Sequence, residues 1–340
     1  MNSNIIYKIQ VFFIDALAKY RLNKIDSKLK IVDLEKINEL MDNTPKKDIV
    51  RKLTIINDSK LNNYINNFKV TLEKNFSADE LSNFYRNIKW LKIKIKKNYL
   101  VNIFLGQKLS GLYDFEANKL SILEDKPKSI YHELFHLSST NFELKQNHPG
   151  LTLNLGNIDI GNGLNEGYTE LLSLRYFDVQ EIASYYLETH FARALELIVG
   201  KEMMQSLYLK NDFWGLIEIL KKYYEVSEIE KFLLSLDLVS EYTAKKSITY
   251  EENEKINFII EDMICFLLKG YCKSIVSTNI NYEEALYSYL YDLNIIFADH
   301  SYIYNLDRFN KVVTDNLKVE FKFPHHVLNY ERNCYNGIRK

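Results

Sequence analysis

Two histidines and a glutamate in one short segment could together bind and use a metal ion. The segment from Ser129 to Leu137 reads SIYHELFHL, so His132, Glu133 and His136 match the pattern H-E-x-x-H. Residues four apart in an α-helix differ by about 40° around its axis and lie one turn apart, so both imidazoles can bind one Zn²⁺ ion. Glu133 projects about 100° from His132, close enough to act on a water molecule beside the metal. The spacing therefore predicts a zinc site with a carboxylate beside it that can hold a metal-bound water.

The same segment carries an apolar face that could anchor the helix. Ile130, Leu134 and Leu137 fall on the side of the helix opposite the histidines. Pro127, just upstream, is typical of a helix start. We therefore expect a helix whose polar side faces the site and whose apolar side packs into the core.

A third ligand is expected downstream, because catalytic zinc sites typically use three protein ligands. The stretch Asn165-Glu166-Gly167, followed by Glu170, stands out there. Asn165 can cap a new helix, which places Glu166 in its first turn and Glu170 one turn later on the same face. Glu166 could complete the metal site, and Glu170 could accept a ring N–H from a zinc-binding histidine.

The positions of glycine and proline and the spacing of apolar residues predict which secondary-structure elements hold these residues. Seven of the 11 glycines lie between Gly106 and Gly167, so strands and loops are expected in the middle of the chain. Up to about Arg86, and again after Glu166, apolar residues recur every three or four positions, which predicts helical flanks. The predicted regions are a helical N-terminal region (1–86), a core with the candidate site (87–174) and a helical C-terminal subdomain (175–340).

Between the flanks the hydrophobic period changes to two, which is typical of strands. Leu91, Ile93 and Ile95 alternate with lysines, which fits a half-buried strand with a solvated lysine face better than a nucleic-acid-binding stripe. Further strands are expected at Val101–Leu105 and around residues 111–115, and a strand at residues 119–123 should pair back across a turn. The predicted fold class is mainly α with one small mixed β-sheet (α+β), confined to about residues 88–124.

The order of these elements resembles a known class of enzymes. A strand, then His132-Glu133-x-x-His136, then Asn165-Glu166-Gly167-x-x-Glu170 is similar to the gluzincin class of zinc metallopeptidases. This class includes thermolysin-like proteases and aminopeptidases whose third zinc ligand lies in an Asn-Glu-Gly motif. The resemblance implies a zincin-like fold, in which the active-site helix packs under a sheet and helical regions flank it.

The resemblance also assigns roles to the residues of these motifs. It implies that three residues bind Zn²⁺, namely His132, His136 and Glu166. It makes Glu133 the general base and acid, and Glu170 a hydrogen-bond partner of a zinc ligand. The implied activity is hydrolysis of peptide bonds by water activated at the metal, and the choice between endo- and exopeptidase stays open.

The resemblance further implies that the last strand before the active-site helix is an edge on which an extended peptide lies. The residues of that predicted edge strand are Lys119, Leu120, Ser121, Ile122 and Leu123. One side of such a strand can pack inward while the main-chain groups at its edge bind the peptide. The expected substrate is therefore a peptide or an unfolded protein.

The donor that stabilises the oxyanion formed during peptide hydrolysis stays open at this point. Such a donor is normally a tyrosine or histidine on a later element. The candidates, in sequence order, are Tyr168, Tyr185, Tyr186, His190, His300, Tyr302, Tyr304, His325 and His326.

Composition and charge argue against several other classes of protein. The 340 residues are 46% hydrophobic and 26% charged, and 44 basic against 45 acidic residues give a net charge of −1. This balance argues against nucleic-acid or anionic-membrane partners. Three cysteines cannot form a disulfide framework, and Cys265 and Cys272 are expected as core thiols. With neither a bilayer-spanning apolar run nor a signal-peptide pattern, a cytoplasmic location is expected, and the oligomeric state stays open.

Three functions are compatible with these patterns. The leading one is an active zinc metallopeptidase. The second is a gluzincin-fold binding or regulatory protein that holds zinc with little or no peptidase activity, and an intact Glu133 counts against it. The third is a helical interaction protein in which the H-E-x-x-H match is accidental. Zinc content and peptide cleavage distinguish the three.

Overall fold

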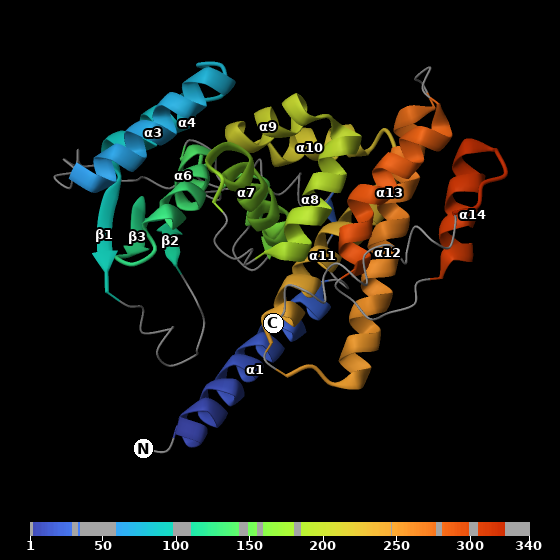
Figure 1. Ribbon diagram of the computed structural model, residues 1–340, viewed down its shortest axis with the longest axis horizontal. Coiled ribbons are helices and arrows are strands. Elements are labelled where there is room, and N and C mark those ends of the chain that lie inside the picture. Colours follow the sequence, from blue (N-terminus) through green and yellow to red (C-terminus); the bar gives the residue numbers. More distant parts are fainter. Residues whose placement is uncertain are drawn as a thin grey trace.

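A computed structural model describes most of the chain and shows a mainly helical protein with a small mixed sheet (Figure 1). The described residues are 3–28, 33–34, 59–97, 110–142, 149–154, 159–179, 185–245, 247–276, 281–298 and 305–323. The predicted mainly α, α+β class is confirmed at this level.

In the sequence, helices both precede and follow the strands of the main sheet. They are α1 (Ser3–Lys28), α3 (Ser59–Asn75), α4 (Ser82–Asn87), α6 (Ile130–Ser138), α7 (Asn162–Phe177), α8 (Tyr186–Val199), α9 (Lys201–Lys210), α10 (Phe213–Leu220), α11 (Val226–Thr243), α12 (Tyr250–Ile275), α13 (Tyr282–Ala298) and α14 (Leu306–Leu317). Short 3₁₀ turns, η1 (Ile88–Trp90) and η2 (Pro127–Ser129), precede the sheet and α6. No helix among the described residues has the length and apolarity needed to cross a membrane.

The main sheet contains three strands in the order β1-β3-β2. They are β1 (Lys92–Lys96), β2 (Gly111–Asp114) and β3 (Lys119–Leu123). β3 pairs in parallel with β1 on one side and antiparallel with β2 on the other, so the sheet is mixed as predicted. The strand expected at Val101–Leu105 lies outside the described residues.

The prediction that β3 is an edge strand is wrong. Lys119, Leu120, Ser121, Ile122 and Leu123 form the central strand, and both of its edges are hydrogen-bonded to neighbouring strands. Alternation of side chains shows which face of a strand is buried but says nothing about how many neighbours it has. Among the described strands, the sheet edge on the side of α6 is therefore β2.

A second, two-stranded antiparallel sheet lies in the connection between α6 and α7. It consists of β4 (Leu153–Asn154) and β5 (Asp159–Ile160). The prediction that all strands fall within about residues 88–124 is therefore wrong. Strands of two residues are too short to show a hydrophobic period, so the pattern could not reveal them.

One continuous hydrophobic core runs through the molecule and holds α6 in place. Ile130, Leu134 and Leu137 are fully buried, as the helical spacing predicted. α6 contacts β2, α3, α4 and α7, while α1 crosses the lower part of the molecule against α11 (Figure 1). Buried side chains of this core extend from Leu22 to Phe323, and the division into three regions stays a prediction.

Candidate metal centre

Three side chains from two helices meet at the predicted site. Nε2 of His132 and Nε2 of His136, both on α6, lie 3.1 Å apart. Oε2 of Glu166, on α7, lies 3.2 Å from the first of these atoms and 3.3 Å from the second. Among the described residues, these are the His, Cys, Asp and Glu side chains whose ligand atoms lie close enough together to hold a metal ion.

The size of this triangle fits a zinc ion. Zn–N and Zn–O bonds of about 2.0–2.1 Å in a tetrahedral site place neighbouring ligand atoms about 3.3 Å apart. The observed distances between the three ligand atoms are 3.1, 3.2 and 3.3 Å. A His₂Glu donor set is also a common set for catalytic zinc. The residues present therefore fit the metal that the sequence predicts.

The first histidine is held by a second carboxylate on α7. Nδ1 of His132 lies 2.9 Å from Oε2 of Glu170, and both side chains are largely buried. If Nδ1 carries the proton and donates it to Glu170, Nε2 of His132 is free to bind a metal. The geometry thus places Glu170 where the sequence predicted it, hydrogen-bonded to the candidate metal ligand His132.

The second histidine is held by residues that the sequence did not single out for this role. Nδ1 of His136 lies 3.5 Å from Oγ1 of Thr169 and 3.4 Å from Nδ2 of Asn165. The Thr169 hydroxyl donates to the backbone carbonyl of Asn165 and lies 2.6 Å from the hydroxyl of Tyr208. Because an amide NH₂ cannot accept a proton, the Thr169 oxygen is the acceptor available to a protonated Nδ1 of His136. The only feature of the sequence that indicates this role is the i+4 spacing of Asn165 and Thr169, which places both on one face of α7.

The expected capping role of Asn165 is wrong. α7 begins at Asn162, three residues before Asn165, and places Glu166 beyond the first turn. Oδ1 of Asn165 accepts a hydrogen bond from the backbone N–H of Leu151 instead. The backbone N–H groups at the start of α7 are capped by a residue far away in the sequence. The carboxylate of Asp237 on α11 accepts hydrogen bonds from the backbone N–H groups of Gly161 and Gly163. A cap supplied 74 residues away leaves no local sequence pattern.

Glu133 lies beside the triangle, buried under strand β2. Its side chain is 7% exposed, and it accepts a hydrogen bond from the backbone N–H of Tyr113. Burial raises the pKa of Glu133, although the neighbouring His132 and His136 lower it. A carboxylate with a raised pKa is suited to take up and release a proton near neutral pH.

In the absence of metal, the histidines and carboxylates of the site strongly shift one another's pKa values. Burial alone would lower the pKa of His132, but its hydrogen bonds to Glu166 and Glu170 raise that pKa to about 10. Burial alone would raise the pKa of Glu166, but His136 and His132 hold it well below its usual range. Without metal, a proton on His132 therefore supplies positive charge that balances the carboxylates.

Tyr185 is the one oxyanion candidate that the described structure brings to the site. Its ring stacks on that of His132, with centroids 5.8 Å apart and planes 15° apart, and its hydroxyl donates to Glu166. The negative charge of Glu166 and burial raise the pKa of Tyr185 well above its usual value, so its hydroxyl stays a hydrogen-bond donor at neutral pH.

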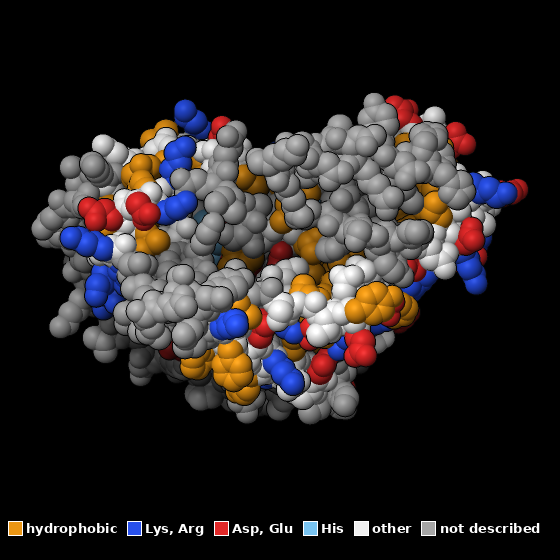
Figure 2. Space-filling view, turned by 60° about the horizontal axis from the view of Figure 1, so that its bottom comes forward, with side chains coloured by type: hydrophobic (Ala, Val, Ile, Leu, Met, Phe, Trp, Pro, Cys, Tyr) orange, Lys and Arg blue, Asp and Glu red, His pale blue; other side chains and the backbone are white. Residues whose placement is uncertain are grey.

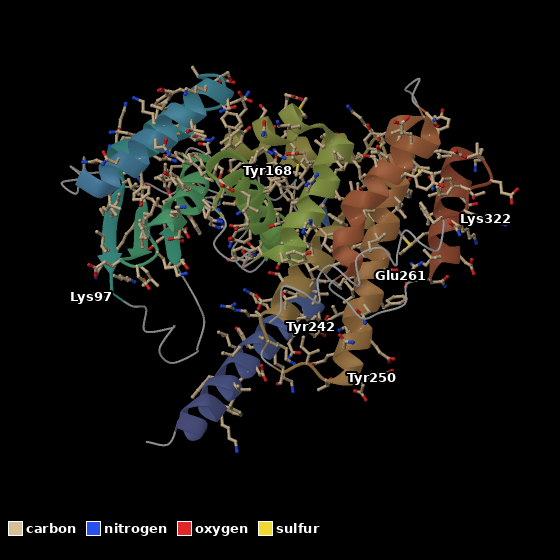
Figure 3. All side chains as sticks on the ribbon, in the orientation of Figure 1. Lys97, Tyr168, Tyr242, Tyr250, Glu261 and Lys322 are labelled. Atoms are coloured by element: carbon tan, nitrogen blue, oxygen red, sulfur yellow. The ribbon has the colours of Figure 1, made fainter. Side chains whose placement is uncertain are left out.

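The other candidates do not join the triangle in the described part of the chain. The hydroxyl of Tyr168 donates to Glu196 between α7 and α8 (Figure 3), and the rings of Tyr186 and His190 contact each other. The remaining candidates lie outside the described residues, namely His300, Tyr302, Tyr304, His325 and His326.

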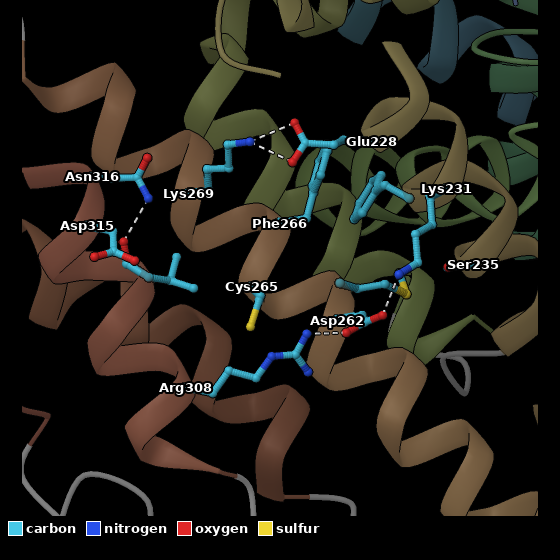
Figure 4. Close-up of a pocket in the computed structure, with 13 residues that line it drawn as sticks. Glu228, Lys231, Ser235, Asp262, Cys265, Phe266, Lys269, Arg308, Asp315 and Asn316 are labelled. Carbon is cyan, nitrogen blue, oxygen red and sulfur yellow. Dashed lines mark hydrogen bonds and ion pairs between the residues drawn. The ribbon is translucent and has the colours of Figure 1, made fainter. Parts of the chain in front are cut away.

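A cavity of about 330 Å³ lies elsewhere, between α11, α12 and α14 (Figure 4). Charged side chains at its rim pair with one another, including Lys269 with Glu228 and Arg308 with Asp262. Cys265 faces this cavity, and burial raises the pKa of its thiol to about 11. Cys272 is fully buried, as predicted for a core thiol, whereas Cys265 is only partly buried.

On the face shown in Figure 2, the described acidic, basic and hydrophobic side chains are interspersed, and neither charge forms a large patch among them. This mixture agrees with the net charge of −1.

No protein-family model matches the chain, and no curated protein or solved structure is significantly similar to it. The resemblance to gluzincins therefore rests on the residues of the candidate site and on their arrangement.

Proposed function

We propose that this protein is a zinc-dependent metallopeptidase of the gluzincin type, with a zincin-like arrangement around α6. The observation that carries the proposal is the triangle of ligand atoms from His132, His136 and Glu166, with the buried carboxylate of Glu133 beside it. A helix face with two histidines has many uses, but a third ligand at tetrahedral distance and an adjacent base together favour hydrolysis.

The three ligand side chains would hold the zinc ion, and Glu170 would keep His132 in the metal-binding tautomer. A bound zinc ion supplies a Lewis acid for the peptide carbonyl and lowers the pKa of water at its open position. Glu133 would accept the proton of the attacking water and pass it to the leaving amine, a contribution of typically ~10²–10⁴-fold in rate.

The peptide would bind along β2, which replaces β3 as the edge strand in this proposal. Leu123 donates its backbone N–H to the carbonyl of Ser110, and residues Gly111 and Ile122 are opposite each other. In an antiparallel pair, hydrogen-bonded and non-hydrogen-bonded positions alternate. The main-chain groups of Gly111 and Tyr113 therefore point away from β3. The N–H of Tyr113 is bound to the Glu133 carboxylate, so the groups that would pair with an extended peptide are those of Gly111 and the carbonyl of Tyr113.

The decisive experiment is the variant Glu133→Gln. Its amide keeps the shape of the side chain but cannot take a proton, so zinc content and peptide affinity should stay near wild type while turnover falls at least ~10²-fold. Zinc content, affinity for a peptide mixture and cleavage are measured on both proteins. Cleavage by Glu133→Gln at the wild-type rate would exclude Glu133 as the base and refute the mechanism.

The metal ligands are tested separately. His132→Ala and His136→Ala should each lose the stoichiometric zinc of the wild-type chain, because two protein ligands hold zinc poorly. Full zinc content in both variants would overturn the site. Zinc in the wild type without cleavage of any peptide would favour the zinc-binding regulatory protein instead.

Tyr185 would donate a hydrogen bond to the oxyanion that forms on the peptide carbonyl. Tyr185→Phe should then lower kcat by ~10²–10³-fold and leave the zinc affinity unchanged. In this structure the same hydroxyl donates to Glu166. A weaker zinc affinity with normal kcat would therefore mean that Tyr185 orients a metal ligand.

A further inference from the structure

The buried carboxylate of Glu133 lies against a strand residue that has no side chain. A Cβ atom placed on Gly111 would lie 2.6 Å from Oε1 of Glu133 and 2.8 Å from its Cγ. Ordinary contacts between non-bonded heavy atoms are about 3.5–4.0 Å. Any side chain at position 111 would therefore take the space that the carboxylate occupies.

The backbone at this position does not itself require glycine. Gly111 is the first residue of β2 and is not among the described glycines with a positive φ. An alanine could adopt the same strand conformation without strain. The requirement for glycine comes from the space needed by Glu133.

The same strand also holds Glu133 through its main chain. The backbone N–H of Tyr113, two residues along β2, donates to the Glu133 carboxylate. Gly111 and Tyr113 point their main-chain groups to the same side of the strand, because both occupy positions not hydrogen-bonded to β3. One residue thus makes room for the carboxylate and the other binds it.

We propose that Gly111 is a positioning residue that sets where the Glu133 carboxylate lies relative to the three metal ligands, an inference that rests on the proposed peptidase function. A methyl group at position 111 is fixed to the sheet, whereas the carboxylate is the mobile end of a side chain. The carboxylate therefore moves, by about 1 Å if ordinary contact distance is to be restored. A displacement of about 1 Å at a reacting group can lower the rate by ~10²-fold.

The activity test uses Gly111→Ala alone and together with Glu133→Asp. Gly111→Ala should lower kcat by ~10–100-fold while KM and zinc content stay near wild type. Aspartate is one methylene shorter and withdraws from the new methyl group. Glu133→Asp should therefore lower kcat much less in the Gly111→Ala background than in the wild type. If the two substitutions act on kcat independently, the proposal is overturned.

A control variant separates positioning of Glu133 from general weakening of the sheet. Ile95 lies on β1, on the far side of β3 from Gly111, and is 45% exposed. Ile95→Ala removes a β-branched side chain from the same sheet and should leave kcat unchanged. A loss of kcat in this variant equal to that in Gly111→Ala would assign the effect to the sheet and refute the positioning role.

A stability measurement tests the contact without any catalysis. In the metal-free protein, Gly111→Ala should lower Tm by about 1–3 °C when Glu133 is present, and should leave it unchanged or raise it in the Glu133→Ala background. Equal Tm shifts in the two backgrounds would refute the contact. If this coupling is found but the wild type cleaves no peptide, the contact between Gly111 and Glu133 stands and the proposed peptidase function fails.

Discussion

The hydrogen bond between His132 and Glu170 makes a quantitative prediction about metal affinity. Nδ1 of His132 and Oε2 of Glu170 are 2.9 Å apart, and the two side chains are only 13% and 9% exposed. Hydrogen bonds of this kind behind a metal ligand typically change metal affinity by ~10–100-fold. Glu170→Ala should therefore weaken zinc binding by that factor, which corresponds to about 1.4–2.7 kcal/mol.

Two further variants should bracket the loss of zinc affinity expected for Glu170→Ala. Glu170→Gln keeps an oxygen that can accept the Nδ1 proton but loses the negative charge, so its loss should be smaller than that of Glu170→Ala. Glu166→Ala removes a ligand atom from the triangle, and its loss should be much larger.

The assay is competition for zinc between each protein and a chromophoric chelator at constant pH and ionic strength. The expected order of affinity is wild type, Glu170→Gln, Glu170→Ala and then Glu166→Ala. If Glu170→Ala loses zinc as completely as the histidine variants while Glu166→Ala retains it, Glu170 is the ligand and the assignment in the triangle is refuted.

Three further predictions concern the elements that support the site. Asp237→Ala should destabilise the fold by about 1–2 kcal/mol in denaturant unfolding, because two backbone N–H groups at the start of α7 lose their acceptor; an unchanged midpoint would refute this cap. Gly167→Ala should lower Tm by several degrees, since its Cβ would lie 2.2 Å from the backbone oxygen of Glu188 on α8, and normal Tm would mean that the two helices are not in such close contact. Burial alone would raise the pKa of Asp262, but Lys231 and Arg308 lower it, so the carboxylate stabilises the fold above about pH 4 and loses this contribution as the pH falls through its lowered pKa. Asp262→Asn should therefore be less stable than wild type by about 1 kcal/mol at pH 7, with a difference that shrinks in acid; a difference independent of pH would contradict the ion pair.

The parts of the site that lie on one helix could be predicted from the sequence. His132 and His136 share a face because four residues make about one helical turn, and Glu166 and Glu170 share a face for the same reason. Both pairs were predicted from spacing alone, and the structure brings the two faces together. The apolar side of α6 followed from the same arithmetic, since it needs no knowledge of its neighbours.

The parts that depend on distant neighbours could not be predicted in this way. The sequence of β3 alternates as in a half-buried strand, yet four of its five residues are buried. Its central place depends on β1, which comes earlier in the chain and pairs with its second edge. The cap of α7 comes from Asp237, and the support of His136 includes Tyr208 through Thr169. Such contacts join segments with no fixed spacing, so no periodic pattern reports them.

The long-range cap of α7 has a consequence for how the protein is made. The helix that carries Glu166 begins with two N–H groups whose acceptor, Asp237, is on α11. A ribosome adds the residues of α11 only after it has completed all three candidate metal ligands. A growing chain that ends before α11 therefore contains His132, His136 and Glu166 but lacks the carboxylate that completes the start of the ligand helix. A fully supported candidate metal site can therefore form only after α11 (Val226–Thr243) has been synthesised.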